Sequence, residues 1–415
     1  MTRLPPVRVA RAVSSIRTAG LGLARRMVPP PVGVLELVSG LIGANTVYAV
    51  AKLGVADALA VGSRTVADVA DELNVDPDAA FRLLRAAAAQ GLFRIDGDRF
   101  ALTALGRPLL SDAPDSMRAV VLMIGDPRYQ SVWSRLPESV TTGQPQAEAV
   151  HGVSMWELLE RDPDFAEIFN EAMSRLSALD WPTVAAAYDF TPFRRIVDIG
   201  GGHGELLASM LGAAPGAEGV LLERDSLLQR AEERLEAAGV LSRCRLESGS
   251  FFDRVPDDGD LYVLRRVVHD LADDEALALL TTLRRGMPDG ATLLLMESVV
   301  QPGGGPDFAK TLDLDMLLFA GGRERTEREY AALLDLGGFE MTRVVPTISP
   351  IFLVEARPAA GGGASTSFSP SRAGVLVAAV AGMCGAAVGG FSASRSSAGT
   401  GRDGALRRHG RRCWP

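Results

Sequence analysis

The sequence predicts an α/β protein: a Rossmann-like, doubly wound parallel sheet that ends in an antiparallel hairpin and is preceded by a helical winged-helix domain. Three observations predict this class. Apolar strand-like runs alternate with helical patterns within residues 186–358. The first of these runs breaks into a cluster of glycines at residues 200–204. Two strand-like segments, residues 339–346 and 351–356, are joined by a short turn and predict the closing hairpin.

The glycine cluster follows a predicted buried strand at residues 196–199, which carries one acid, Asp198. Gly200, Gly202 and Gly204 stand at alternate positions, directly before an expected helix. Glycine lets the backbone approach a ligand closely, and a helix start offers unpaired N–H groups. The spacing differs from the Gly-x-Gly-x-x-Gly of dinucleotide folds and lacks a P-loop lysine. It suits a cationic ligand such as the amino group of S-adenosylmethionine (SAM), although a tight turn without a ligand would use similar residues.

The later strands support a ligand site at the carboxyl end of the sheet. The second strand ends in Glu223, about 20 residues beyond the glycines, where nucleotide folds place an acid on the ribose hydroxyls. Further strands are expected at residues 261–264 and 292–296, with a helix between them that Asp273 and Asp274 would cap. The closing hairpin favours a SAM methyltransferase sheet over a plain dinucleotide fold.

The composition restricts the class of protein. The chain has 415 residues, which is enough for two domains and a large core. Its net charge of −8 provides no global basic field that would attract nucleic acid. The three cysteines lie far apart without metal or disulfide spacing, which favours a reducing cytoplasm.

The two ends of the chain differ from its middle. Residues 1–33 carry several arginines and no acid, and we expect a disordered basic arm rather than a targeting peptide or a membrane-surface helix. Residues 359–415 are rich in Gly, Ala, Ser and Arg and predict a low-complexity, disordered tail. Within this tail, residues 373–391 are long enough to span a membrane but only weakly hydrophobic, so no membrane contact is expected.

Residues 34–115 predict the winged-helix domain. An apolar helical stretch with glycine breaks covers residues 35–62, and two short helices follow at residues 65–75 and 78–90. Two short strands then flank an Asp-Gly turn, which is typical of a β-hairpin. Residues 116–185 are expected to form a helical linker that contributes to a substrate pocket.

A winged helix raises the hypothesis of DNA binding. Its second helix offers only Arg82 and Arg85 to neutralise phosphates, and several acids surround it. We therefore expect a structural or dimerising role for this domain, with a homodimer as the assembly and no nucleic-acid partner.

Several motifs occur in a fixed order behind the winged helix. They are Asp-Ile-Gly-Gly-Gly-His-Gly at 198–204, Gly-Ser-Phe-Phe-Asp at 249–253, His269-Asp270, and Gly-Gly-Arg-Glu-Arg-Thr at 321–326. With this set, the chain resembles the small-molecule O-methyltransferases of plant caffeate type and their actinobacterial polyketide relatives over residues 35–357. The Gly-Ser-Phe-Phe variant is similar to the anthracycline O-methyltransferases. The resemblance implies that SAM is the cofactor and that residues 186–358 bind it.

The resemblance also implies a set of cofactor-binding residues. They are Asp198, Gly200, Gly202, Gly204, Glu223, Ser250, Phe251, Arg265 and Arg175. In this family pattern the glycines wrap the methionine part of SAM, the glutamate holds the ribose, and the serine and phenylalanine flank the adenine. Arg175 would reach the methionine carboxylate.

The implied catalytic residues are His269 as general base and two acids, Glu297 and Glu324, that fix its imidazole. A carboxylate on the far nitrogen of an imidazole raises its basicity and sets its tautomer. The expected substrate-binding residues are Met173, Asp270, Met316 and Phe319. A capping or core role for the histidine and ordinary core packing for the apolar residues remain open. Asp273 and Asp274 could also suggest a magnesium site, but helix capping explains them better, and no metal is expected.

Four functions remain as hypotheses. The first is O-methylation of a hydroxyl on a small aromatic or polyketide-type metabolite. The second is an anthracycline-type hydroxylase of the same fold, which holds SAM without transferring its methyl group. A DNA-binding regulator and a methylase of another nucleophile are the third and fourth. The mass of the product separates most of them, because methylation adds a methylene and hydroxylation adds an oxygen.

Overall fold

The computed structural model describes residues 13, 16, 20, 22–24 and 26–360. Most of the predicted basic arm and nearly all of the predicted tail, including residues 373–391, lie outside the described residues. The first long helix, α2 (Pro30–Leu53), begins inside the span that was expected to be an arm.

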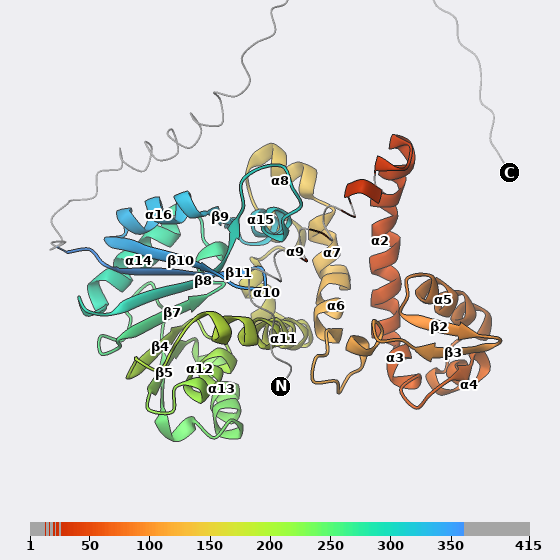
Figure 1. Ribbon diagram of the computed structural model, residues 1–415, viewed down its shortest axis with the longest axis horizontal. Coiled ribbons are helices and arrows are strands. Elements are labelled where there is room, and N and C mark those ends of the chain that lie inside the picture. The colour runs from red at the N-terminus through yellow and green to blue at the C-terminus, as the bar shows by residue number, and fades with distance from the viewer. Residues whose placement is uncertain (1–12, 14–15, 17–19, 21, 25, 361–415) are drawn as a thin grey trace, which may run out of the picture. The chain divides into compact units, whose positions relative to one another are not determined.

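The main sheet has the predicted mixed topology (Figure 1). Its strands run in the order β10-β11-β8-β7-β4-β5-β6, and the short β9 (Arg325–Thr326) pairs with β8. The five strands β4 to β8 pair in parallel, whereas β11 pairs antiparallel with both β8 and β10. The strand bounds are β4 (Arg195–Ile199), β5 (Glu218–Glu223), β6 (Cys244–Ser248), β7 (Leu261–Arg265), β8 (Thr292–Val300), β10 (Phe339–Pro346) and β11 (Ile351–Pro358).

Helices cover both faces of this sheet. One apolar cluster joins the sheet to α14 (Asp273–Gly286) and α16 (Glu327–Leu336), and a second joins it to α12 (Glu205–Ala213) and α13 (Asp225–Ala237). Alternate residues of one strand enter different clusters, as Val197 and Ile196 do, because successive side chains in a strand point to opposite faces. The order of strands reverses at β4, which is where doubly wound sheets bind ligands beyond their carboxyl ends.

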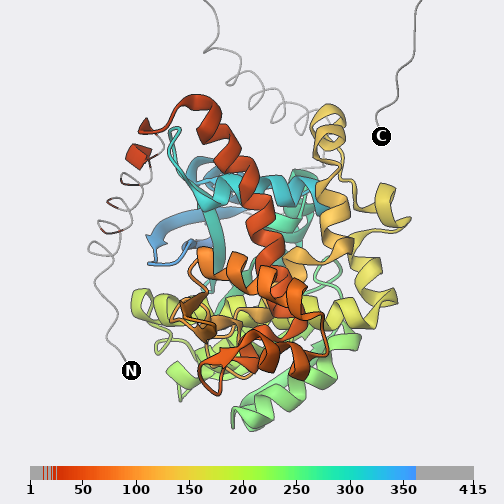
Figure 2. The same ribbon diagram turned by 90° about the vertical axis from the view of Figure 1, so that its right-hand side faces the viewer.

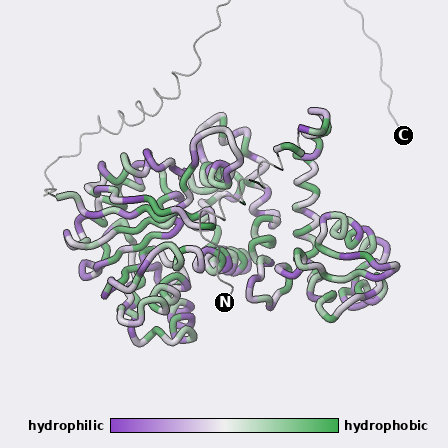
Figure 3. The backbone as a smooth tube through the Cα atoms, viewed as in Figure 1, coloured by the Kyte–Doolittle hydropathy of each residue, from purple (hydrophilic) through white to green (hydrophobic). Residues whose placement is uncertain are grey.

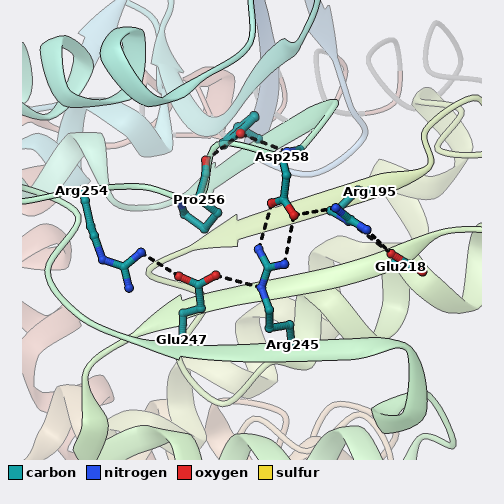
Figure 4. A network of polar contacts seen from close by, with 9 residues as sticks. Arg195, Glu218, Arg245, Glu247, Arg254, Pro256 and Asp258 are labelled. Atoms are coloured by element: carbon teal, nitrogen blue, oxygen red, sulfur yellow. Dashed lines mark hydrogen bonds and ion pairs between the residues drawn. The ribbon is translucent and has the colours of Figure 1, made fainter.

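The edge strand β6 was not predicted. The residues of β6 are partly exposed or exposed, and the strand carries charges instead of a continuous apolar run. These charges form a network at the amino ends of the strands (Figure 4). Asp258 accepts hydrogen bonds from both Arg195 and Arg245, which also contact Glu218 and Glu247. Charged side chains of this kind protect an exposed sheet edge from pairing with other chains.

The N-terminal domain contains the predicted winged-helix elements. They are β1 (Arg64–Thr65), α4 (Val66–Leu73), α5 (Pro77–Ala89), β2 (Phe93–Asp96) and β3 (Arg99–Leu102), with the strands in the order β1-β3-β2. The expected glycine breaks were wrong at Gly40 and Gly43, through which α2 continues, but a break does occur after Leu53. The helix ends at Gly54, which has a φ of 73°, and α3 (Val55–Ala58) follows.

Helix α2 is apolar and mostly exposed. Eight of its large hydrophobic side chains are at least 42% exposed: Val32, Val34, Leu35, Leu37, Val38, Leu41, Ile42 and Leu53. The hydrophobic colouring follows the strands of the main sheet and also appears along α2 (Figure 3). Among the described residues, α2 is the one helix whose length and composition would suffice to cross a membrane. Figure 2, which faces the side of the N-terminal domain, shows α2 extending past the winged-helix elements.

A helical region connects the two parts. It consists of α6 (Arg118–Gly125), α7 (Pro127–Trp133), α8 (Leu136–Thr142), α9 (Ala147–His151), α10 (Met155–Arg161) and α11 (Pro163–Ala187). A later helix, α15 (Phe308–Phe319), packs against α7 and α8. The region therefore joins residues that precede β4 and residues that follow β8 into one apolar cluster, which includes Tyr129, Phe165 and Phe319.

Candidate active site

The glycine turn lies between β4 and α12, as predicted. Gly200, Gly202 and Gly204 have φ values of 67°, 57° and 74°, a backbone region that other residues seldom adopt. A Cβ atom added to Gly202 would meet nothing within 4 Å, so this point of the turn faces open space. A Cβ atom on Gly201 would lie 2.4 Å from an oxygen of Asp198, which therefore packs directly beneath the turn.

Asp198 is fully buried, and neither of its carboxyl oxygens has a hydrogen-bond partner among the described residues. Burial raises the pKa of Asp198 to about 7, and the nearby Glu223 adds to the rise. A buried carboxyl group with unused acceptors beneath an open backbone turn suits a ligand that brings a positive charge or N–H donors. The amino group of SAM has this chemistry, so the residues fit the expected cofactor.

Glu223 and Phe251 also lie at the turn. The carboxylate of Glu223 accepts hydrogen bonds from the backbone N–H of Gly202 at 2.9 Å and of Arg224 at 2.8 Å. The ring of Phe251 lies 3.6 Å from the position that a Cβ atom of Gly200 would take. Ser250 is exposed, and its hydroxyl accepts from the N–H of Phe252 at 3.2 Å.

The two predicted arginines have protein partners. Arg265 at the end of β7 donates to buried Asp180 of α11 at 2.9 Å. Arg175 donates to Glu171 at 2.6 Å and lines a cleft of about 710 Å³. His203 of the glycine turn lines the same cleft. The contact of Arg265 with Asp180 links β7 to the helical region.

The three predicted catalytic side chains meet in one buried cluster. His269 lies in the short turn Val268–Asp270 beyond β7, Glu297 lies within β8, and Glu324 directly precedes β9. The Nδ1 atom of His269 is 2.7 Å from Glu324 Oε1 and 4.0 Å from Glu297 Oε2. Its Nε2 atom is 3.6 Å from Asp270 Oδ1.

The loop that carries Glu324 can approach His269 because of a glycine. A Cβ atom on Gly322 would lie 2.1 Å from the backbone oxygen of His269, so a larger residue would displace the loop. The N–H of Arg323 donates to that same oxygen at 2.8 Å. The N–H of Glu324 donates to Asp313 of α15 at 2.8 Å, which fixes the glutamate from the other side.

Burial dominates the electrostatics of this cluster. It raises the pKa of Glu324 to about 8 and that of Asp270 to about 6. Burial also raises the pKa of Glu297, whose Oε1 accepts from the N–H groups of Val267 and Val268. When Glu324 is ionised it accepts from the Nδ1–H of His269, and this tautomer leaves Nε2 free as an acceptor.

Asp273 forms ion pairs with Arg323 and with fully buried Arg325. The expectation that Asp273 and Asp274 cap α14 was wrong, because the N-cap is Ala272, whose N–H donates to Glu275. Ligand atoms of His269, Glu297 and Glu324 do lie within 4.8 Å of one another, but the contact at 2.7 Å is a hydrogen bond between two of them.

The expected acceptor residues are packed in the helical region. Met316 and Phe319 are both 8% exposed, and Phe319 stacks on Tyr129 with ring centroids 4.3 Å apart. Met173 of α11 packs against a small cluster that includes Val120 and Met123. The sequence did not point to Asp180, the one acid between Glu171 and Ala187 of α11, or to Asp315, which lies two residues after Asp313 in α15. Only an acid on an apolar helix face could have signalled them.

Comparisons with known proteins show the family to which the chain belongs. The model of the O-methyltransferase dimerisation domain matches residues 35–112, and that of the O-methyltransferase domain matches residues 133–340. The chain is 37% identical over 326 residues to phenazine O-methyltransferase PhzM of Lysobacter antibioticus, which covers 78% of this chain and 95% of that protein.

Two further relatives extend the comparison. O-demethylpuromycin-O-methyltransferase of Streptomyces alboniger is 39% identical over 334 residues, covering 78% of this chain and 88% of that one. The structure of NcsB1, an O-methyltransferase from neocarzinostatin biosynthesis in complex with SAM and a hydroxy-methyl naphthoic acid, has a TM-score of 0.67. It is 33% identical and covers 76% of this chain and 96% of that one. The chain therefore belongs to the family of SAM-dependent O-methyltransferases that carry an N-terminal dimerisation domain.

Proposed function

We propose that this enzyme methylates a hydroxyl group on a small aromatic or polyketide-type secondary metabolite, with His269 as general base. The observation that carries the proposal is the 2.7 Å contact between His269 Nδ1 and Glu324, since it leaves Nε2 free to accept a proton. Relatives that act on phenazines, puromycin precursors and mitomycins support an aromatic or related acceptor.

The residues at the glycine turn would hold the cofactor. We assign Gly200, Gly202 and Gly204 to its close approach, Asp198 to its amino group, and Glu223 to its ribose hydroxyls. Phe251, beside the turn, would cover the adenine. When bound, SAM supplies an electrophilic methyl group on a sulfonium. Alignment of an acceptor oxygen with that group contributes up to about 7–11 kcal/mol in favourable cases.

His269 would remove the proton from the acceptor hydroxyl. A phenol has a reference pKa near ~10 and an imidazole one near ~6.5, so the transfer needs assistance. The carboxylate of Glu324 supplies it by stabilising the imidazolium that forms when Nε2 takes the proton. Glu297, which is held by two backbone N–H groups, adds a second negative charge 4.0 Å away.

A nitrogen nucleophile is the second candidate. Two relatives are named as N-methyltransferases, one for 8-amino-8-demethylriboflavin and one for phenazine-1-carboxylate. A neutral amine attacks without prior loss of a proton, so such a reaction would need His269 less. The effect of removing His269 therefore separates the two nucleophiles.

The proposal is tested by incubating the enzyme with SAM and a panel of hydroxylated naphthalenes, anthraquinones and phenazines. We expect a product heavier by one methylene and an equal amount of S-adenosylhomocysteine. A product heavier by one oxygen would replace this proposal with the hydroxylase. Methylation of amines alone would replace the oxygen nucleophile with nitrogen.

We further propose that the enzyme is a cytoplasmic homodimer that buries α2 between two copies. The eight exposed hydrophobic side chains of α2 form a surface that monomers seldom expose, and the matched dimerisation domain includes them in large part. The acids around α5, of which Asp78 lies near Arg82, disfavour a nucleic-acid partner. Light scattering at micromolar concentration should return twice the chain mass, and a monomer mass would contradict the dimer.

A further inference from the structure

Helix α15 contains an acid that the His269 cluster does not use. Asp313 of this helix holds the backbone of Glu324, whereas Asp315 makes no contact with the catalytic residues. Asp315 and Phe319 are four residues apart and so lie on the same face of the helix. If Phe319 lines the acceptor pocket as the sequence predicts, Asp315 belongs to the same wall.

Two aromatic residues of α7 hold this carboxylate. The hydroxyl of Tyr129 is 2.6 Å from both oxygens of Asp315, and the indole N–H of Trp133 donates to Oδ1 at 3.0 Å. The ring of Tyr129 stacks on Phe319. The result is one carboxylate set into a wall of three aromatic side chains that join α7 to α15.

The charge of Asp315 is uncompensated. Both donors are neutral, and no cationic side chain of the described residues pairs with it. Burial raises its pKa to about 6, so the group still ionises at neutral pH. Asp315 is only partly exposed. Carboxylates that are largely removed from water are normally paired with a cation. Even Asp258 at the sheet edge, whose side chain is 33% exposed, pairs with two arginines.

Helix α15 leads directly to the reaction centre. After Phe319 the chain passes through Gly321 and Gly322 to Glu324, and Gly322 touches the backbone of His269. A ligand that lies along α15 with its hydroxyl near His269 would thus extend over aromatic rings toward Asp315.

We propose that Asp315 is a specificity-determining residue that selects an aromatic acceptor carrying a basic amino group. This inference rests on the proposed function, because it describes the acceptor of that same site. The ammonium group supplies the positive charge that Asp315 lacks, and the rings of Tyr129, Trp133 and Phe319 cover the aromatic body of the acceptor. A neutral acceptor of equal shape would leave the carboxylate unpaired.

The test compares two probes of equal size, a naphthol that carries an aminomethyl group and a naphthol that carries an ethyl group. Their binding to the full-length enzyme loaded with S-adenosylhomocysteine is measured by calorimetry, so that no turnover is needed. We expect the wild-type enzyme to bind the amine at least about 10-fold more tightly, as for a hydrogen bond to a charged group. In Asp315→Asn this ratio should fall to about one, with the affinity for the ethyl probe changed less than about 2-fold. Asp315→Glu should retain the preference.

Glu355→Gln provides the matched control. Glu355 is also buried and accepts from a tyrosine hydroxyl, that of Tyr188 at 2.7 Å, but it has its own cation, Arg343. This variant should leave the probe ratio unchanged.

An equal affinity of the wild-type enzyme for both probes, or no binding of the amine, would overturn the proposal. So would an equal loss for both probes in Asp315→Asn, because Asp315 would then only link α7 to α15. If Asp315→Asn does not fold, the proposal is judged by the ratio of the two probe affinities in the wild-type enzyme and in Asp315→Glu. Methyl transfer to the probes is measured separately with labelled SAM. If no methyl transfer is detected while the preference for the amine probe is intact, the proposed function is contradicted and this inference is not.

Discussion

Both ends of the main sheet carry acids, but the burial and pairing of these acids are opposite at the two ends. At the amino ends of the strands, Asp258 is partly exposed and is paired with Arg195 and Arg245 (Figure 4). At the carboxyl ends, Asp198 and Glu297 are fully buried, and each has at least one oxygen without a partner among the described residues. The pKa shifts follow: the arginines lower the pKa of Asp258, whereas burial raises that of Asp198.

This difference separates charges that serve the fold from charges that serve a ligand. An exposed, paired carboxylate stabilises a protein slightly and requires no ligand to satisfy its charge. A buried carboxyl group without partners is costly in the isolated chain and is retained where a ligand or a reaction uses it. The comparison predicts that substitutions at the carboxyl ends change binding and catalysis, whereas those at the amino ends change only stability.

The largest of these effects is expected at the glycine turn. Gly202→Val places a β-branched residue at a φ of 57°, which costs about 1–3 kcal/mol of backbone strain. The turn must then distort, and we expect the Kd for SAM to rise by about 5–150-fold in calorimetry. Gly212→Val, in the following helix and with no atom within 4 Å of its Cβ, is the control and should keep normal affinity. Unchanged SAM binding in Gly202→Val would remove the turn from the cofactor site.

A smaller effect is expected for Glu324→Gln. Burial raises the pKa of Glu324 to about 8, so the carboxylate that would stabilise the imidazolium of His269 is fully formed only above that pH. The kcat of the wild-type enzyme should therefore rise through about pH 8. The glutamine cannot ionise, and we expect kcat to fall by about 10-fold and this rise to be lost. An identical pH profile in both enzymes would show that Glu324 does not act through His269.

The smallest effect is expected at the amino ends. Asp258→Asn breaks exposed ion pairs and should lower the free energy of unfolding by about 1 kcal/mol or less. The depressed pKa of Asp258 means that this stabilisation is present above the ordinary aspartate pKa and is lost as the pH falls through the lower folded value. Denaturant unfolding should therefore show a difference at pH 7 that shrinks in strong acid. A loss of methyl transfer in this variant would break the distinction between the two ends.

The residues at the carboxyl ends differed in how visible they were in the sequence. Asp198 could be predicted because it belongs to an apolar strand pattern, in which a polar residue is out of place. Glu297 lies just beyond the expected strand at residues 292–296, and Glu324 follows no strand, so only the resemblance to a family pointed to their roles. Asp180 and Asp315 could not be found, because acids are common on helices and nothing local shows which face packs inward.

The errors in the fold have a similar origin. Strand β6 was missed because an edge strand alternates charges with half-buried residues and so lacks a long apolar run. The glycines of α2 were expected to break it, but each costs only about 1 kcal/mol in a helix of 24 residues. The apolar stretch of α2 exceeds what a small domain needs for its own core, and on this ground the sequence predicted a homodimer.

The most direct test of the account is the turnover of His269→Ala as a function of pH, with SAM affinity measured separately. If Nε2 of His269 accepts the acceptor proton, kcat should fall by about 10²–10⁴-fold while the Kd for SAM stays unchanged. The residual activity should then rise with pH as the acceptor hydroxyl ionises by itself. A loss smaller than about 5-fold that does not change with pH would contradict the account and show that alignment of the substrates alone carries the reaction.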